Sequence, residues 1–192
     1  MFMISRFAEL VKLLPHRSLD KLIDEYGADK HSKGFGCRRQ LLAMLYGQLS
    51  GATSLRQLEV GFNAQRTHHY HLRCGEIRRS TLADANAARD PQVFSRVAQE
   101  LMNHVQRKTR SELTQLLYLL DSTSLTLKGR GFDQWTAQRR TRNTQGMKLH
   151  LLYAPGSEVP VFHSMTMANV NDIDEAVKLP IEPNSTSSGL SA

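Results

Sequence analysis

The hydrophobic pattern of this chain changes near residue 113, and that change constrains its fold more than any other feature. Before it, stretches such as FAELVKLL carry apolar residues at the spacing of one helix face. After it come three short apolar runs rich in strand-forming residues, at 116–120, 147–154 and 159–167. The segment APGSE between the last two runs has the composition of a hairpin turn. We therefore expect a helical module followed by the first strands of an α+β or α/β sheet.

Capping signals place several helices in the first part of the chain. Ser54, with Gln57 three residues later, fits a capping box that starts a helix after the turn SGATS. Thr81 is a second box-like start, and Asp90 caps a further, long amphipathic helix. The helix, Gly-containing turn and helix in residues 38–62 have the outline of a helix-turn-helix DNA reader. An ordinary helical hairpin has the same outline and stays open as the alternative.

The chain is basic, with 25 Lys and Arg residues against 18 Asp and Glu, a formal charge of +7 and a pI near 9.7. Such a surface attracts polyanions, and nucleic acid is the leading partner. Most of the excess charge lies in residues 128–148, where Asp133 is the only acid. This segment could follow a phosphate backbone while Trp135 stacks on a base, or it could be a solvated loop with Trp135 in the core. Its basic residues are Lys128, Arg130, Arg139, Arg140, Arg142 and Lys148.

The sequence contains no sign of a membrane segment, a disulfide framework or a zinc site. No run reaches the ~18 apolar residues that span a bilayer, and the start MFMISRFAEL lacks the pattern of a signal peptide, so we expect a cytoplasmic protein. Cys37 and Cys74 stand far apart without partner cysteines. In THHYHL, His69 and His71 would share one face of a strand. No third ligand lies at useful spacing, which favours a half-exposed polar segment over a metal site.

One acidic residue stands out because an apolar run leads directly into it. The run LLYLL ends at Asp121, and the hydroxyl residues STS follow. An aspartate at the end of a buried strand is often a turn former, because its side chain hydrogen-bonds the backbone two residues later. A carboxylate at the exit of a central strand can also hold a metal ion in a nuclease-like site. The residues alone leave both interpretations open.

Five stretches of the chain occur in an order and spacing found in a known family. They are FNAQRTHHYHL, RRSTLADANAARD, LLYLLDSTSLTL, GMKLHLLYA and NDIDEAVKLPIEPNST. From about residue 5 to 186, this pattern resembles the bacterial insertion-sequence transposases of family four, which are DDE transposases. The resemblance implies a helical DNA-binding region followed by a ribonuclease H-like domain, whose two aspartates and one glutamate hold two divalent metals, Mg²⁺ or Mn²⁺. Asp121 matches the first aspartate, so the resemblance favours a catalytic metal ligand over a turn former.

The resemblance also implies domains, partners and neighbours of the site. It divides the chain into a DNA-binding region at 1–110, a partial ribonuclease H-like domain at 111–183 and a disordered polar tail at 184–192. The implied partners are DNA, as terminal inverted repeats and target DNA, and a second copy of the chain in a homodimer on that DNA. The implied location is the nucleoid of the cytoplasm. Asn171 and Asp172 match an element that opens the helix before the next strand, near the site.

The chain departs from the family after residue 184. There the family continues with a strand that ends in the second aspartate and, much later, supplies the glutamate, whereas here IEPN leads into STSSGLSA. None of the remaining acids matches the missing pair. We therefore expect a truncated chain with an incomplete sheet, an exposed strand edge and no metal-dependent DNA cleavage of its own. Two functions follow from this: a transposase by descent that is catalytically incomplete, or a non-catalytic DNA-binding fragment that regulates or inhibits transposition.

Overall fold

The computed structural model describes residues 2–109, 117–127, 136–138, 143–154, 159–178 and 186–189. The chain divides into two compact units, Met1–Glu100 and Leu101–Ala192, which we call the helical unit and the sheet unit. The division lies inside helix α6 (Gln92–Thr109), whereas the sequence predicted a boundary after residue 110. Across the described residues, no helix combines the length and apolar character that a bilayer crossing requires.

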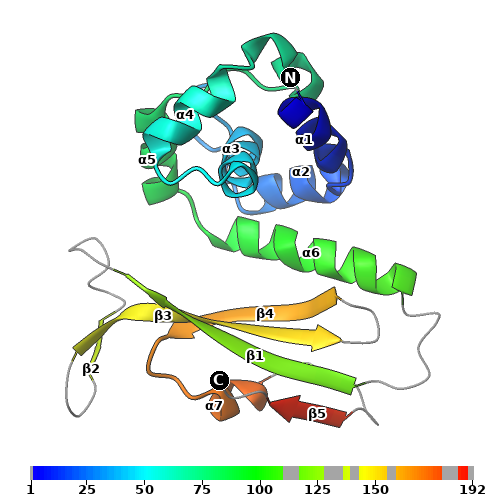
Figure 1. Cartoon of the computed structure of the whole chain (residues 1–192), viewed down its shortest axis with the longest axis vertical. Helices are drawn as coiled ribbons and strands as arrows, with labels where there is room; N and C mark the ends of the chain where they lie inside the picture. The colour runs from blue at the N-terminus through cyan, green and yellow to red at the C-terminus, as the bar shows by residue number, and fades with distance from the viewer. Residues whose placement is uncertain are drawn as a thin grey trace. The chain divides into compact units, whose positions relative to one another are not determined.

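The helical unit contains the helices that the hydrophobic pattern predicted (Figure 1). In chain order, the elements before α6 are α1 (Phe2–Lys12), α2 (His16–Glu25), α3 (Cys37–Ser50), α4 (Leu55–Asn63), η1 (Arg66–Leu72) and α5 (Arg79–Ala88). The segment THHYHL lies in the 3-10 helix η1, so the shared strand face considered for His69 and His71 does not apply. Local main-chain hydrogen bonds, such as that from Arg73 N to Tyr70 O at 3.2 Å, fold it into tight turns instead.

Side-chain caps confirm two of the three predicted helix starts. Ser54 Oγ accepts a hydrogen bond from Gln57 N at 3.2 Å, and Asp90 Oδ1 accepts one from Gln92 N at 2.9 Å. The start predicted at Thr81 is wrong, because α5 already begins at Arg79, where no side chain caps it.

Helices α3 and α4 form the predicted helix, turn and helix. Gly51 ends α3 in the left-handed conformation at φ 68°, which glycine adopts without steric cost. A Cβ atom on Gly47 would lie 2.6 Å from Leu58 Cδ1, so glycine allows the two helices to approach closely. The fully buried ring of Phe62 meets Tyr46 edge-on, with 5.3 Å between ring centroids. The Ser54 cap thus fixes where α4 begins, and packing in the core fixes where α4 lies.

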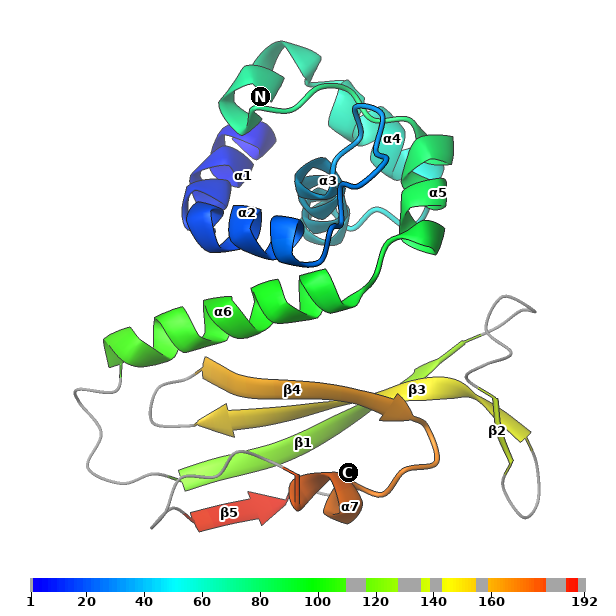
Figure 2. The ribbon, with the colours of Figure 1, turned by 180° about the vertical axis from the view of Figure 1, so that it is seen from behind.

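The sheet unit contains the three predicted apolar strands and two further ones (Figure 2). The elements are β1 (Leu117–Thr126), β2 (Thr136–Gln138), β3 (Asn143–Ala154), β4 (Val159–Met167), α7 (Asp172–Ala176) and β5 (Thr186–Gly189). Strand β3 pairs antiparallel with β1 on one side and with β4 on the other, and β2 pairs with the first residues of β3. The pairing of Ala154 with Val159 confirms the predicted hairpin, whose loop lies outside the described residues.

Two features of the sheet differ from the sequence expectations. Asp121 was expected at the end of its strand, but β1 continues to Thr126, because the Ser and Thr residues after Asp121 pair with β3 throughout. The tail 184–192 was expected to be disordered, leaving the edge of β1 open. Instead, Thr186–Gly189 forms β5, which pairs parallel with Leu117–Leu120. Main-chain hydrogen bonds form a parallel ladder whatever the side chains, so small hydroxyl residues can occupy this edge.

Candidate active site

Asp121 lies in the middle of β1 with its side chain exposed, directly opposite Leu151 of β3. Because side chains alternate along a strand, Asp121 shares a face of the sheet with Thr123, while Ser122 points to the other face. The cross-strand row through Asp121 continues through Leu151 to His163 of β4. The carboxylate is therefore an accessible acid on an otherwise largely apolar face.

The opposite face of the sheet carries a polar cluster that binds helix α7. We call this cluster the α7 network, and it comprises Ser122, Lys148, His150, Thr166 and Asp172. Lys148 Nζ lies 3.2 Å from Asp172 Oδ1 and donates to Val170 O at 2.9 Å. The side chain of Lys148 is only 14% exposed. The ammonium group of Lys148 is thus bound by acceptors within the sheet unit.

His150 is the centre of the α7 network. Its side chain is 0% exposed, and Nε2 lies 2.8 Å from Thr166 Oγ1. On the other side of the ring, Nδ1 lies 3.3 Å from Asp172 Oδ1 without hydrogen-bond geometry. Burial lowers the pKa of His150 below its ordinary value, and this outweighs the opposing effect of Asp172 and Glu175. The imidazole is therefore held neutral near pH 7.

The two acids of α7 that face the sheet are held ionised. Burial raises the pKa of Asp172, but hydrogen bonds from Ser122 and Lys148 outweigh it, so the pKa lies below its ordinary value. Glu175 is buried, and its interactions with Ser164 and Lys178 lower its pKa as well. These contacts fix a helix of five residues, which is too short to be stable alone.

The structure does not bring the predicted site residues together. Asp121 and Ser122 occupy opposite faces of β1, and Asp172 interacts with Ser122, so Asp172 lies across the sheet from Asp121. Asn171 is the N-cap of α7 but makes no side-chain cap hydrogen bond. Lys148, predicted to contact DNA, is the lysine of the α7 network. The other predicted DNA-binding residues lie outside the described residues: Lys128, Arg130, Trp135, Arg139, Arg140 and Arg142.

The described residues do not form a divalent metal site around Asp121. Magnesium prefers octahedral oxygen coordination and is commonly held by more than one carboxylate. In the described parts of the sheet unit, the other carboxylates are Asp172, Asp174 and Glu175, and all three belong to α7. No group of three His, Cys, Asp or Glu side chains within the described ranges could hold a metal ion. Asp121 is therefore one candidate ligand without its partners.

Sequence reasoning missed His150 and Ser122, although a signal for both existed. The alternation of MKLHLL places Lys148 and His150 on one face of β3. A lysine and a histidine on the buried face of a strand need polar partners, and the hydroxyls after Asp121 could supply them. The acid in NDIDEA could not be assigned to this face from sequence, because its contact with β3 is made across 24 residues of chain.

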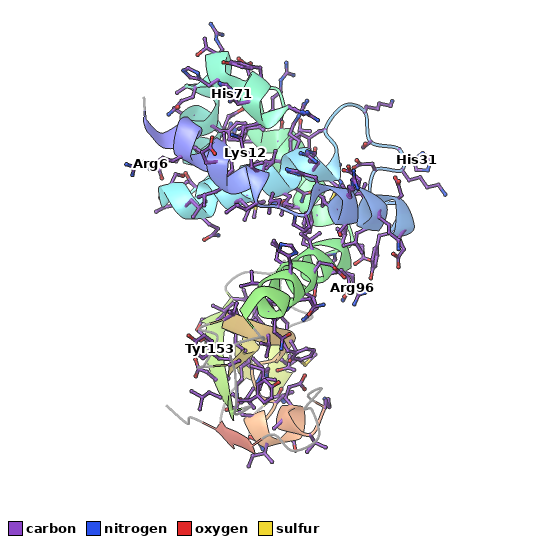
Figure 3. The ribbon with its side chains drawn as sticks, turned by 90° about the vertical axis from the view of Figure 1, so that its right-hand side faces the viewer. Arg6, Lys12, His31, His71, Arg96 and Tyr153 are labelled. Atoms are coloured by element: carbon purple, nitrogen blue, oxygen red, sulfur yellow. The ribbon has the colours of Figure 1, made fainter. Side chains whose placement is uncertain are left out.

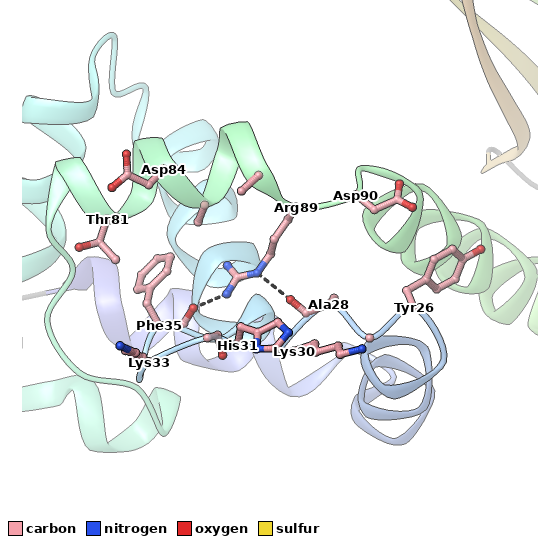
Figure 4. Close-up of a pocket in the computed structure, with 14 residues that line it drawn as sticks. Tyr26, Ala28, Lys30, His31, Lys33, Phe35, Thr81, Asp84, Arg89 and Asp90 are labelled. Atoms are coloured by element: carbon pink, nitrogen blue, oxygen red, sulfur yellow. Dashed lines mark hydrogen bonds between the residues drawn. The ribbon is translucent and has the colours of Figure 1, made fainter.

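The motif RRSTLADANAARD, which supported the family resemblance, has a structural role in the helical unit. Asn86 Oδ1 accepts a hydrogen bond from Gln40 Nε2 at 2.6 Å. Arg89 donates to Ala28 O at 3.1 Å and to Phe35 O, two bonds drawn in Figure 4. These bonds tie the end of α5 to the segment between α2 and α3 beside a cavity of about 670 Å³, with Lys30, His31 and Lys33 along its side (Figure 4).

Comparisons with known proteins give matches to both halves of the chain. Residues 3–73 match the family model described as a domain of unknown function (DUF4372), and residues 112–184 match the Transposase DDE domain. The protein named "Putative transposase y4zB" of Sinorhizobium fredii is 38% identical over 105 residues, which is 55% of this chain and 28% of that protein. No solved structure matches the chain. The Transposase DDE domain implies a ribonuclease H-like fold, and together these matches support a DDE transposase.

Proposed function

We propose that this chain is a transposase-related DNA-binding protein, with Asp121 as the first carboxylate of a DDE site. The observation that carries the proposal is the exposed carboxylate of Asp121 on β1, inside the region similar to the Transposase DDE domain. Strand β1 pairs with antiparallel β3 through Asp121, and parallel β5 pairs with the residues just before it, Leu117–Leu120. Rigid strands are the supports on which catalytic carboxylates can be held at fixed separation.

The activity of the family is phosphoryl transfer on DNA, with cleavage at an element end and joining to a target. The DNA partners proposed here are terminal inverted repeats and target DNA, bound by a homodimer at the nucleoid. The described residues supply one of the three carboxylates, so we expect no Mg²⁺- or Mn²⁺-dependent cleavage by this polypeptide alone. The chain spans 28% of the length of its curated relative. We therefore propose the activity of a whole transposase for the family and not for this chain alone.

The alternative function is a non-catalytic DNA-binding regulator of transposition. A specific observation favours it: residues 1–100 hold 15 Lys and Arg against 10 Asp and Glu, and the helical unit also contains the α3 and α4 pair. A basic helical unit could occupy element ends and compete with an active enzyme for them.

The test combines DNA binding and DNA nicking with one variant. Wild type and Asp121→Asn are compared by gel shift on an inverted-repeat duplex and on random duplex at physiological salt, and by nicking of a plasmid that carries element ends, with Mg²⁺ or Mn²⁺. We expect both proteins to prefer the inverted repeat and neither to nick. Nicking by wild type that Asp121→Asn abolishes would overturn catalytic incompleteness. Equal affinity for both duplexes would refute specific binding of element ends.

A further inference from the structure

Helix η1 carries three neighbouring aromatic rings, of which Tyr70 and His71 are exposed and His68 is half-buried. The side chain of Tyr70 is 69% exposed, and its ring centroid lies 3.8 Å from that of His71. The rings of His68 and His71 are nearly parallel, at 11°, with 6.4 Å between centroids. Figure 3 labels His71 on this part of the helical unit. One exposed aromatic residue is ordinary, but here the Tyr70 ring packs on the His71 ring at an interplanar angle of 36°, and a planar ligand can add to this stack of rings.

The inward residues of the same helix hold these rings in place. Leu72 and His69 are buried in the helical unit, and His69 Nε2 lies 2.9 Å from Phe62 O. The His69 ring also packs on the Phe62 ring, with 4.6 Å between centroids. Since η1 is anchored through the core, the outward rings are presented on a fixed backbone and lose little freedom on binding.

Two arginines, Arg39 and Arg73, lie near the end of η1. Arg73 follows η1 in the left-handed conformation, at φ 50°, and leads into the turn at Gly75. The Arg39 guanidinium lies against Gly75, which brings the first turn of α3 next to the end of η1. In the part of the chain that the structure describes, neither Arg39 nor Arg73 has a carboxylate within ion-pair distance. Two arginines, Arg38 and Arg39, thus stand at the positive end of α3, where the helix dipole disfavours them.

His16 reports the positive potential of this region. Arg38 Nη2 lies 3.1 Å from His16 Nδ1, and Arg38 has one acidic neighbour, Asp20, at 3.7 Å. Burial lowers the pKa of His16 most, and the charge of Arg38 lowers it further; Asp20 opposes this, and Arg73 adds a smaller lowering. Both guanidinium groups therefore act on the same place, and a bound anion would relieve their repulsion.

We propose that this region, the η1 surface (Arg38, Arg39, His68, Tyr70, His71 and Arg73), binds a single-stranded segment of DNA. The inference rests on the proposed DNA-binding function and deepens it by naming the surface and the form of the DNA. Bases in a duplex are stacked on each other and cannot cover the rings, whereas exposed bases can stack on Tyr70 and His71. The arginines contact the phosphates of the same strand. Arg39 and Arg73, which have no carboxylate within ion-pair distance among the described residues, favour a polyanion over a protein partner, since the cores of protein interfaces are depleted of charged residues.

The experiment measures fluorescence anisotropy of the full chain with three labelled probes of roughly 16 nucleotides, the upper end of the size of a single-strand binding site. The probes are oligothymidine, an abasic strand with the same phosphates but no bases, and a random duplex. Four variants are compared with wild type: Tyr70→Ala, Tyr70→Phe, Arg73→Gln and, as a control, Leu13→Ala. Leu13 is an exposed apolar residue at the end of α1, outside the η1 surface.

Wild type is expected to bind oligothymidine more tightly than the abasic strand. Tyr70→Ala should weaken oligothymidine binding about 5- to 100-fold and leave abasic binding nearly unchanged, which corresponds to the loss of one stacked base. Tyr70→Phe and Leu13→Ala should bind like wild type, whereas Arg73→Gln should weaken both single strands. Thermal melts of all variants should coincide, because the substituted side chains are exposed.

The outcomes separate this inference from the proposed function. Equal binding of oligothymidine by wild type and Tyr70→Ala, or equal binding of the abasic strand and oligothymidine by wild type, overturns the stacking surface. Binding of duplex alone overturns it as well, while DNA binding by the chain stands. Failure to bind any probe would remove the proposed function and the inference together. Binding of a protein instead of DNA through Tyr70 would overturn the assignment to nucleic acid.

Discussion

The two units of this chain both bury charged side chains, but they neutralise them differently. In the helical unit, the Arg89 side chain is 9% exposed, and it donates mostly to uncharged acceptors: the carbonyls of Ala28 and Phe35 and the amide oxygen of Gln40. Its one acidic neighbour, Asp29, lies 3.5 Å away. A guanidinium group keeps its charge at any ordinary pH, so the buried charge of Arg89 does not titrate.

In the sheet unit, buried charge depends on one titratable partner. Lys148 and His150 both lie within 3.3 Å of the same oxygen of Asp172, on a helix of one turn. Loss of the Asp172 charge, or protonation of His150, disturbs the whole α7 network at once. The comparison teaches that Arg89 relies mainly on acceptors that do not titrate, whereas the attachment of α7 depends on the protonation states of His150 and Asp172.

The largest expected effect is at Arg89. Arg89→Met keeps an apolar stem of similar length but leaves the Ala28 and Phe35 carbonyls and the Gln40 amide without their donor. We expect the helical unit to lose about 3 kcal/mol of unfolding free energy in urea, followed by circular dichroism. Arg96→Met, at an exposed position of α6, should change it by less than about 0.5 kcal/mol. Equal small losses would show that Arg89 does not hold the segment between α2 and α3.

A smaller effect is expected at Asp172. Asp172→Ala removes the carboxylate from Lys148 and His150 and should cost about 1 kcal/mol, since Asp172 is 40% exposed and solvent screens part of the interaction. Asp174→Ala is the matched control, because Asp174 occupies the same first turn of α7 but is exposed. Hydrogen exchange of β3 amides measures the unfolding free energy of the sheet unit in both variants, and only Asp172→Ala should lower it by this amount. If both variants lost the same stability, the interaction of each carboxylate with the helix dipole would explain the loss, and the contacts of the α7 network would not.

Acidification tests the same network through His150. The pKa of His150 is lowered in the folded chain, so the neutral imidazole stabilises the fold above its ordinary pKa of 6.5. That contribution is lost progressively as pH falls from 6.5 toward the folded value. The protection factors of amides in α7 and β3, corrected for the intrinsic exchange rate at each pH, should therefore fall as the pH drops from 6.5 toward the folded value, and His150→Gln should flatten this response. His163, whose pKa burial also lowers, leaves a residual dependence of the same sign. An unchanged response in His150→Gln would assign the acid sensitivity to another group.

The elements of the fold follow from sequence better than their connections do. Helical period and caps such as Ser54 predicted α1 to α4 and α6, because these signals act within a few residues. The continuation of β1 beyond Asp121 and the formation of β5 depend on pairing with strands far along the chain, which no local pattern specifies. Lys148 was assigned to DNA by counting charges in its own segment, a count that omits the acid 24 residues later.

Sequence reasoning singled out one residue of the candidate site, Asp121, and its catalytic role stays a prediction. Asp121 stood out through the apolar run before it, and the family resemblance gave it a role. Its exposure agrees with that role. The polar groups across the sheet were invisible to the same reasoning, since Ser122, His150 and Asp172 converge from three separate elements.

The smallest expected effect concerns Asp121 itself. Aspartate is among the residues least suited to strands, and Asp121 is exposed within β1 opposite Leu151. A residue kept for function and not for stability should leave the fold more stable when replaced by a better strand former. Asp121→Thr should therefore raise the unfolding free energy of the sheet unit by about 0.5 kcal/mol. Urea unfolding followed by hydrogen exchange of β1 amides measures the change.

The reciprocal substitution makes this prediction decisive. Thr123 lies on the same face of β1, two residues further along and also exposed. Thr123→Asp should destabilise by a similar amount, because the same side chain is then placed at the neighbouring position of the same strand. If Asp121→Thr instead destabilised the sheet unit, Asp121 would make a structural interaction, and its exposure on β1 would no longer argue for a catalytic carboxylate. The sheet unit would then depend on polar groups on both of its faces, and not only on the α7 network.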